Sequence, residues 1–104
     1  MWLFTSKAFV SIVADRKDSS RLLVRAREQG AIEELFPEAE VFEDLAADYR
    51  YRAFLSRDAV RDRVAAYVEG IAYDNFKNSI PHDKAAYHAA CNRVWGVMYG
   101  LQER

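Results

Sequence analysis

Four arginines lie at alternate positions in two stretches of the chain that have the composition of β-strands. Arg25 and Arg27 lie in one stretch, and Arg50 and Arg52 lie in the other. Successive side chains of a strand point to opposite faces, so both arginines of a pair point the same way. Guanidinium groups make bidentate contacts with phosphates and carboxylates. If the two strands are neighbours in one sheet, its arginine side could therefore bind RNA, single-stranded DNA or an acidic protein.

The same pattern also fits a solvated surface without a ligand. Glu40, Glu43 or Asp44, on the strand expected between the two stretches, could pair with the arginines across the sheet. Only Phe54 is available for stacking on the arginine side. The 15 Lys and Arg residues stand against 16 Asp and Glu residues, which excludes a globally basic nucleic-acid binder. A charge-paired face, a protein contact and a nucleic-acid site all stay open.

Residues 73–83, YDNFKNSIPHD, hold polar groups next to aromatic rings. Asp74, Lys77 and His82 supply a carboxylate, an amine and an imidazole, the groups of acid–base catalysis, and His88 follows on the next helix. Asp and Asn also cap helix ends, and no spacing here matches a known catalytic motif. We therefore expect no catalytic residues and a protein that is not an enzyme.

Cys91 is the only cysteine, so an internal disulfide and a CxxC zinc site are both excluded. It lies three residues after His88, and a thiol beside an imidazole can be a nucleophile. Cys91 also falls on the apolar stripe of the expected final helix, where a free cysteine is usually part of the core. No phosphate-binding loop, HExxH or EF-hand pattern occurs. The sequence predicts no metal and no cofactor.

Aromatic residues make up 13% of the chain and gather at its beginning and in its last third. Most are expected in the core, and any that stay exposed indicate an interface, because Trp, Tyr and Arg are typical anchors. Trp2 and Tyr99 are the candidates. The wide apolar stripe around Tyr99 could cover both the sheet and a second copy, which makes a homodimer one expectation.

The elements that must position these residues follow from the hydrophobic pattern. Strands are expected at 2–5, 8–14, 21–27, 40–44 and 48–56, with Ser6-Lys7 as a tight turn or a bulge. A short helix is expected at 29–36, and two longer helices follow, the first capped by Asp58. Strands without long crossover helices favour an antiparallel sheet. We predict one α+β domain over residues 1–104, with four or five antiparallel strands covered on one face by the two C-terminal helices.

Length and composition are ordinary for a globular domain with one core. No stretch approaches the ~20 apolar residues of a membrane span. The apolar beginning lacks a basic region and carries Lys7, so it is a poor signal peptide. We expect a cytoplasmic protein without a membrane contact.

Four segments of the chain, MWLFTSKAFVSIV, DYRYRAFLSRD, YDNFKN and VWGVMYGLQ, together resemble a group of short bacterial proteins with no assigned activity. The resemblance covers nearly the whole chain and implies a bacterial, intracellular protein of one domain. We expect a small non-enzymatic bacterial or phage-associated binding protein that acts through protein–protein contact, as an inhibitor, adaptor or homodimeric module. The alternative is a nucleic-acid-binding domain. The predicted binding residues are Arg25, Arg27, Arg50, Arg52, Trp2 and Tyr99.

Overall fold

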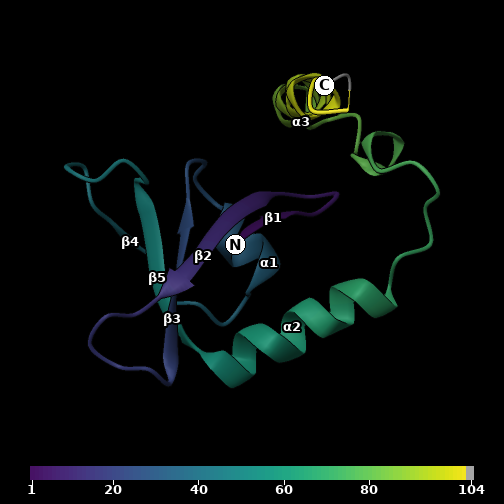
Figure 1. Cartoon of the computed structure of the whole chain (residues 1–104). Helices are drawn as coiled ribbons and strands as arrows, with labels where there is room; N and C mark the ends of the chain where they lie inside the picture. The colour runs from purple at the N-terminus through teal and green to yellow at the C-terminus, as the bar shows by residue number, and fades with distance from the viewer. Residues whose placement is uncertain (103–104) are drawn as a thin grey trace. The chain divides into compact units, whose positions relative to one another are not determined.

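The structure is a computed structural model and describes residues 1–102 (Figure 1). These residues form two compact units, Met1–Ile71 and a second unit that begins at Ala72. The prediction of one domain over residues 1–104 stays a prediction. None of the helices in the described part of the chain has the length and apolar character needed to cross a membrane.

The first unit is built on a five-stranded sheet in the order β1-β2-β3-β5-β4, and every neighbouring pair is antiparallel. The predicted α+β class with an antiparallel sheet is confirmed, and so is the pairing of the two arginine-bearing stretches. The strands are β1 (Trp2–Phe4), β2 (Phe9–Ala14), β3 (Arg21–Ala26), β4 (Phe42–Glu43) and β5 (Tyr51–Ser56).

Short polar turns connect the first three strands. Ser6-Lys7 is a tight turn, because the backbone N–H of Thr5 donates to the Ala8 carbonyl at 3.0 Å and the Thr5 hydroxyl accepts from the Ala8 N–H. Between β2 and β3, the carboxylates of Asp15 and Asp18 accept hydrogen bonds from backbone N–H groups two residues further on. These side-chain-closed turns fix the antiparallel register of the strands that follow.

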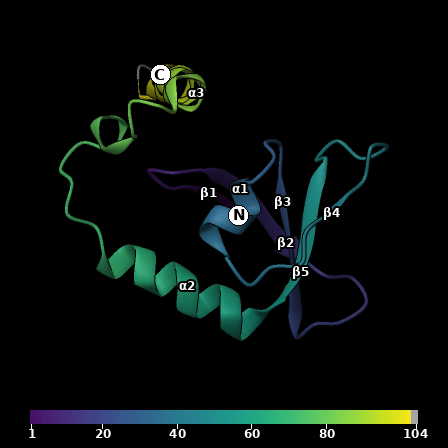
Figure 2. The same ribbon diagram turned by 180° about the vertical axis from the view of Figure 1, so that it is seen from behind.

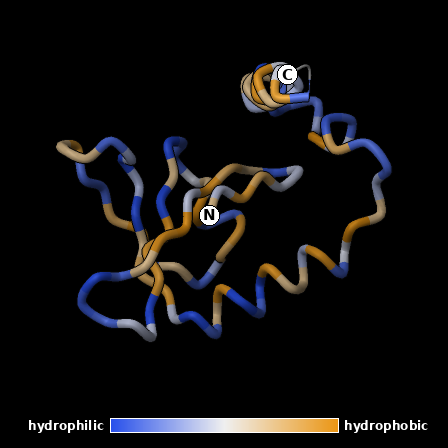
Figure 3. The backbone as a smooth tube through the Cα atoms, viewed as in Figure 1, coloured by the Kyte–Doolittle hydropathy of each residue, from blue (hydrophilic) through white to orange (hydrophobic). Residues whose placement is uncertain are grey.

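One face of the sheet carries the core of this unit. Alternate strand residues such as Val10, Ile12, Val24 and Ala53 are buried there, and the tube of Figure 3 shows the corresponding orange stretches along the strands. The helix α1 (Ala31–Leu35) packs on β2, β3 and β5 with buried apolar residues, and Figure 2 shows it in front of the strands. The buried residues of this segment are Ala31, Ile32, Leu35 and Phe36.

The chain enters α1 through Gly30, whose φ of 85° lies in the left-handed region. Only glycine adopts this conformation without a penalty from its Cβ atom. Pro37 follows Phe36 and prevents the helix from continuing. The helix is therefore shorter than the predicted range 29–36, because Gln29 and Gly30 form the turn that leads into it.

The second helix of this unit, α2 (Arg57–Glu69), starts directly after β5. The predicted N-cap at Asp58 is wrong: the Ser56 hydroxyl accepts from the Ala59 N–H at 3.1 Å, and Asp58 lies in the first turn. Val60 packs into the core from this helix, and the Tyr67 hydroxyl donates to the Leu35 carbonyl at the end of α1. Within the first unit, α1 and α2 thus form the layer that covers the sheet.

The second unit contains the 3-10 helix η1 (Lys77–Ser79) and the helix α3 (Ala85–Tyr99), which contact each other. Among its residues up to 102, the buried side chains are Ile80, Tyr87 and Cys91. The predicted apolar stripe of the final helix is therefore buried only in its first half. Val94, Trp95, Met98 and Leu101 belong to the same stripe and are exposed.

Candidate functional site

The candidate site lies on the outer face of the sheet, which is the face turned away from α1 and α2. Antiparallel partners point to the same face, so the register can be followed across all strands. Arg25 on β3 stands opposite Arg52 on β5, as the alternation in the two stretches predicts. The same cross-strand row continues to Ser11 and Trp2 on one side and to Phe42 on the other.

Three of the four predicted arginines gather around one tyrosine, two at its ring and one at its backbone carbonyl. Tyr49 is 4% exposed, and the guanidinium carbons of Arg25 and Arg27 lie 4.5 and 4.2 Å from its ring centroid. The Arg52 guanidinium donates to the Tyr49 carbonyl at 3.3 Å, and that of Arg27 donates to the Asp48 carbonyl at 3.0 Å. Tyr49 lies just before β5, which begins at Tyr51, so the alternation of that strand does not extend back to it.

Arg25 is half-buried in this cluster. Its guanidinium donates to the Ser11 hydroxyl at 2.8 Å, and Ser11 is 1% exposed although it lies on the outer face. The Nε atom of Arg25 is buried and has no hydrogen-bond partner. Arg25 is therefore held by a hydroxyl and an aromatic ring, and neither neutralises its charge.

The fourth arginine, Arg50, does not join this cluster. It forms an ion pair with Glu43 of β4 at 3.3 Å, and its guanidinium carbon lies 5.6 Å from the ring centroid of Tyr51. The predicted pairing of a carboxylate of residues 40–44 with the arginines is thus found for Arg50. The ion pairs of residues 1–102 include no carboxylate partner for Arg25, Arg27 or Arg52.

Arg21 is a further arginine of the outer face. It pairs with Asp15 at 2.7 Å, and its guanidinium carbon lies 4.4 Å from the ring centroid of Phe54. The backbone N–H of Lys17 and the Arg21 guanidinium hold the pKa of the Asp15 carboxyl below its ordinary value. This end of the face is therefore charge-compensated, whereas the Tyr49 cluster is not.

The sequence indicated Phe54 as the one ring available beside the arginines, and this expectation is wrong. The register places four more aromatic side chains on the outer face. Trp2 packs edge-on against Phe9, Phe4 stacks on Phe9, and Phe42 stacks on Phe54 with centroids 6.0 Å apart. Their shared face depends on the register of β1 and β4, which hydrophobic alternation in such short strands does not fix. The sequence did not indicate Phe4, Phe9 and Phe42. It predicted Trp2 as a binding residue but did not place it on the arginine side of the sheet.

Tyr99 belongs to the second unit. It lies at the end of α3 and stacks on Trp95 with ring centroids 5.3 Å apart and an interplanar angle of 13°. Lys77 donates to the Asn92 side chain at 3.1 Å, and its Nζ atom lies 4.4 Å from the centroid of the Trp95 ring. Tyr99 is therefore part of a separate aromatic group on α3.

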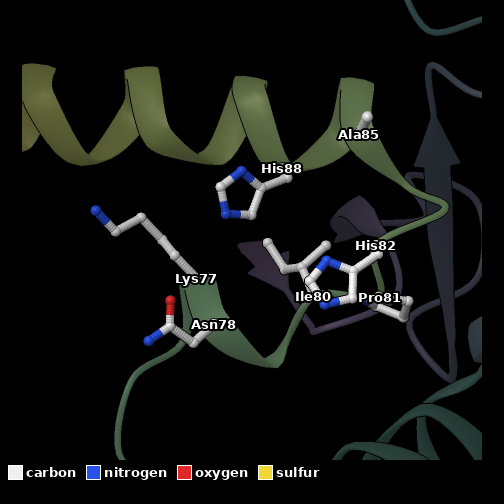
Figure 4. A pocket seen from close by; sticks show the side chains of 7 residues that line it. All are labelled: Lys77, Asn78, Ile80, Pro81, His82, Ala85 and His88. Atoms are coloured by element: carbon white, nitrogen blue, oxygen red, sulfur yellow. The ribbon is translucent and has the colours of Figure 1, made fainter.

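The YDNFKN segment forms the turn around η1. The Asn75 side chain accepts from the Asn78 N–H at 3.1 Å, a local side-chain-to-backbone bond that closes this turn. A pocket of about 470 Å³ lies between this turn and the start of α3. Figure 4 shows the imidazoles of His82 and His88 and the side chain of Lys77 on its wall. Asp74 is not among its lining residues, and residues 1–102 hold no group of three or more His, Cys, Asp or Glu side chains that could bind a metal. The pocket is lined by Lys77, Asn78, Ile80, Pro81, His82, Ala85 and His88.

Cys91 is buried in the second unit, as its place on the apolar stripe predicts. Burial raises the pKa of the Cys91 thiol above its ordinary value, against a smaller opposing effect of a hydrogen bond with Tyr87. A raised pKa leaves less thiolate, which is the nucleophilic form. Cys91 is therefore a packing residue here.

No family model, no curated protein and no solved structure matches this chain. The resemblance to a group of short bacterial proteins stays a prediction.

Proposed function

We propose that the protein is a small non-enzymatic binding protein that acts through protein–protein contact, as a homodimeric module, an inhibitor or an adaptor. The contact surface is the C-terminal half of α3. One observation carries the proposal, namely the run of large apolar side chains that this part of the helix exposes to water. They are Val94, Trp95, Val97, Met98 and Tyr99, and Leu101 follows in the turn directly after the helix.

The arrangement of these side chains supports a protein partner. A surface helix of a globular protein is apolar along one stripe, and a helix that is apolar around most of its circumference is normally buried. Val97 is 74% exposed, yet it lies among Trp95, Met98 and Tyr99. Exposed patches of this kind mark interaction sites. The stacked Trp95 and Tyr99 rings, with Lys77 over Trp95, supply the anchors that dominate interface energies.

The setting proposed for this activity is a bacterial cytoplasm, with either a host or a phage origin. The single cysteine and the resemblance to short bacterial proteins support it. In this setting, a preformed surface that covers a partner can inhibit or recruit that partner without catalysing a reaction.

The experiment compares two valine-to-glutamate variants. Val97 on α3 and Val68 on α2 are both exposed helical valines, at 74% and 60%. Light scattering on a concentration series of the wild type, V97E and V68E measures their masses. We expect a dimer for the wild type and V68E and a monomer for V97E, because a carboxylate in an apolar interface is costly.

If the wild type is a monomer, the same three proteins serve as baits in a bacterial lysate. A protein that the wild type and V68E retain and V97E loses supports the inhibitor or adaptor form. A monomer that retains no such protein contradicts the proposal.

A further inference from the structure

The outer face of the sheet holds positive charges that have no anionic partner. Arg25, Arg27 and Arg52 meet at Tyr49, and none of the ion pairs among residues 1–102 involves them. By contrast, Arg21 and Arg50 at the margins of this group pair with Asp15 and Glu43. The centre of the face is therefore electrically positive although the whole chain carries a net charge of −1.

The geometry of the three guanidinium groups suits an external anion. Contacts with the Tyr49 ring, the Ser11 hydroxyl and backbone carbonyls fix their positions. These contacts use only some of the five N–H donors of each group. Arg25 Nε is buried, so the N–H groups that remain for an external anion are those of the terminal guanidinium nitrogens. A preorganised arginine with free donors is well suited to bind phosphate oxygens.

Flat aromatic side chains flank these charges. Trp2 stands at one end of the Arg25–Arg52 row and is 68% exposed, and Phe42 at the other end is 43% exposed. Phe54, next to Phe42, is 40% exposed. Adjacent strands are about 4.8 Å apart, so the row from β1 to β4 spans about 19 Å, the length of a few nucleotides.

We propose that the outer face binds a single-stranded nucleic acid. Bases stack on Trp2 and on the Phe42–Phe54 pair, and phosphates lie against Arg25, Arg27 and Arg52. Exposed rings on an open sheet recognise unpaired bases by stacking, and a basic centre tracks the backbone. An acidic peptide would satisfy the charges but would leave the exposed rings without a matching flat surface. The inference goes beyond the proposed protein contact, because it uses another surface.

The test measures the binding of fluorescein-labelled oligouridylate and oligothymidylate of eight nucleotides by anisotropy, with the full chain at low salt. The variant R25Q/R52Q removes two charges of the cluster. The matched variant R16Q/R93Q removes two exposed arginines that lie outside it. We expect R25Q/R52Q to bind at least about tenfold more weakly. R16Q/R93Q should stay within about twofold of the wild type.

The dependence on salt gives a second measurement. Three neutralised phosphates of a single strand predict a slope of log K against log salt of about −2, and the double variant should reduce the slope by about 1.4. A comparison of the affinities for oligouridylate and oligothymidylate shows whether the face prefers RNA or DNA. V97E should bind as the wild type does, so a failure of the protein-contact proposal would leave this result intact.

Tryptophan fluorescence keeps the test valid if R25Q/R52Q fails to fold. The chain has two tryptophans, and W95F leaves Trp2 as the only one. Stacking of a base on Trp2 should quench its emission as the oligonucleotide is added. Four results would overturn the inference: no binding at low salt, equal losses in both double variants, equal affinity for a duplex of the same length, or tighter binding of polyglutamate.

Discussion

Tyr49 organises the candidate surface at the scale of single residues. Its buried ring supports two guanidinium groups, and its carbonyl accepts a hydrogen bond from a third. Guanidinium groups that stack on a ring keep their charge and their planar set of donors, whereas a carboxylate partner would compensate the charge. One tyrosine thus holds three like charges close together without neutralising them.

Two glycines allow a sharp comparison at the same scale. A Cβ atom at Gly30 or at Gly96 would meet nothing within 4 Å, so neither position has a steric conflict. Gly30 has a φ of 85°, and we expect G30A to lower the free energy of unfolding by about 1 kcal/mol. Gly96 lies inside α3, and we expect G96A to stabilise its unit by about 0.5–1 kcal/mol. Urea unfolding followed by circular dichroism checks both signs, and a stabilised G30A would contradict the assigned conformation.

At the scale of elements, the junction between β5 and α2 determines where the sheet layer ends and the helical layer begins. Ser56 is both the last residue of β5 and the N-cap of α2, and there is no loop between the two elements. The backbone N–H of Arg57 also donates to the Ser20 carbonyl at 2.8 Å, which ties the helix start to the chain entering β3. The capping hydroxyl and this backbone bond therefore both hold the first turn of α2 at the end of β5.

The cap has a measurable consequence. S56A removes the acceptor for the Ala59 N–H, and we expect the free energy of unfolding to fall by about 1 kcal/mol. S56D keeps an oxygen at the same place, and Asp is as good an N-cap as Ser, so we expect it to retain the wild-type stability. Chemical denaturation of the three proteins separates these results. Equal losses in S56A and S56D would contradict the capping role.

Short elements have a large effect on the candidate surface. β4 has two residues, yet its pairing with β5 brings Phe42 into the Arg25–Arg52 row and Glu43 to Arg50. β1 has three residues and brings Trp2 into the same row. Each edge strand thus supplies one exposed ring to the face whose centre comes from β3 and β5.

At the scale of the whole molecule, buried apolar side chains are distributed unequally between the two units. The core cluster lies entirely in the first unit, between the sheet and its two helices. In the second unit α3 buries Tyr87 and Cys91, while its C-terminal half exposes large apolar side chains. The first unit therefore has the packing of a folded core, whereas the second unit exposes most of the large apolar side chains in the C-terminal half of α3.

Hydrogen exchange should show this difference. We expect the slowest amides in β3, which pairs with β2 on one side and with β5 on the other, and faster exchange in the C-terminal half of α3 at low protein concentration. If α3 mediates self-association, its protection should rise with concentration while that of β3 stays constant. Mass spectrometry of deuterium uptake at two concentrations checks this. Protection of α3 equal to that of β3 at the lowest concentration would contradict its exposure.

Local pattern in the sequence was sufficient to predict the class of fold and part of the site. Alternation alone separates Leu22, Val24 and Ala26 from Leu23 and Arg25, because each strand needs one apolar face. The same alternation predicted that Arg25 and Arg52 share a face, which the pairing of β3 with β5 confirms. These properties depend on neighbours in sequence and on the need to bury apolar surface.

Only the tertiary structure decided which side chains surround the arginines. Tyr49 reaches Arg25 and Arg27 because β5 starts three residues later than the pattern predicts, and Arg50 turns to Glu43 because β4 lies beside it. Trp2 and Phe42 reach opposite ends of one row through the registers of two edge strands. Register is set by turns and by long-range pairing between segments distant in sequence, so no local pattern contains it.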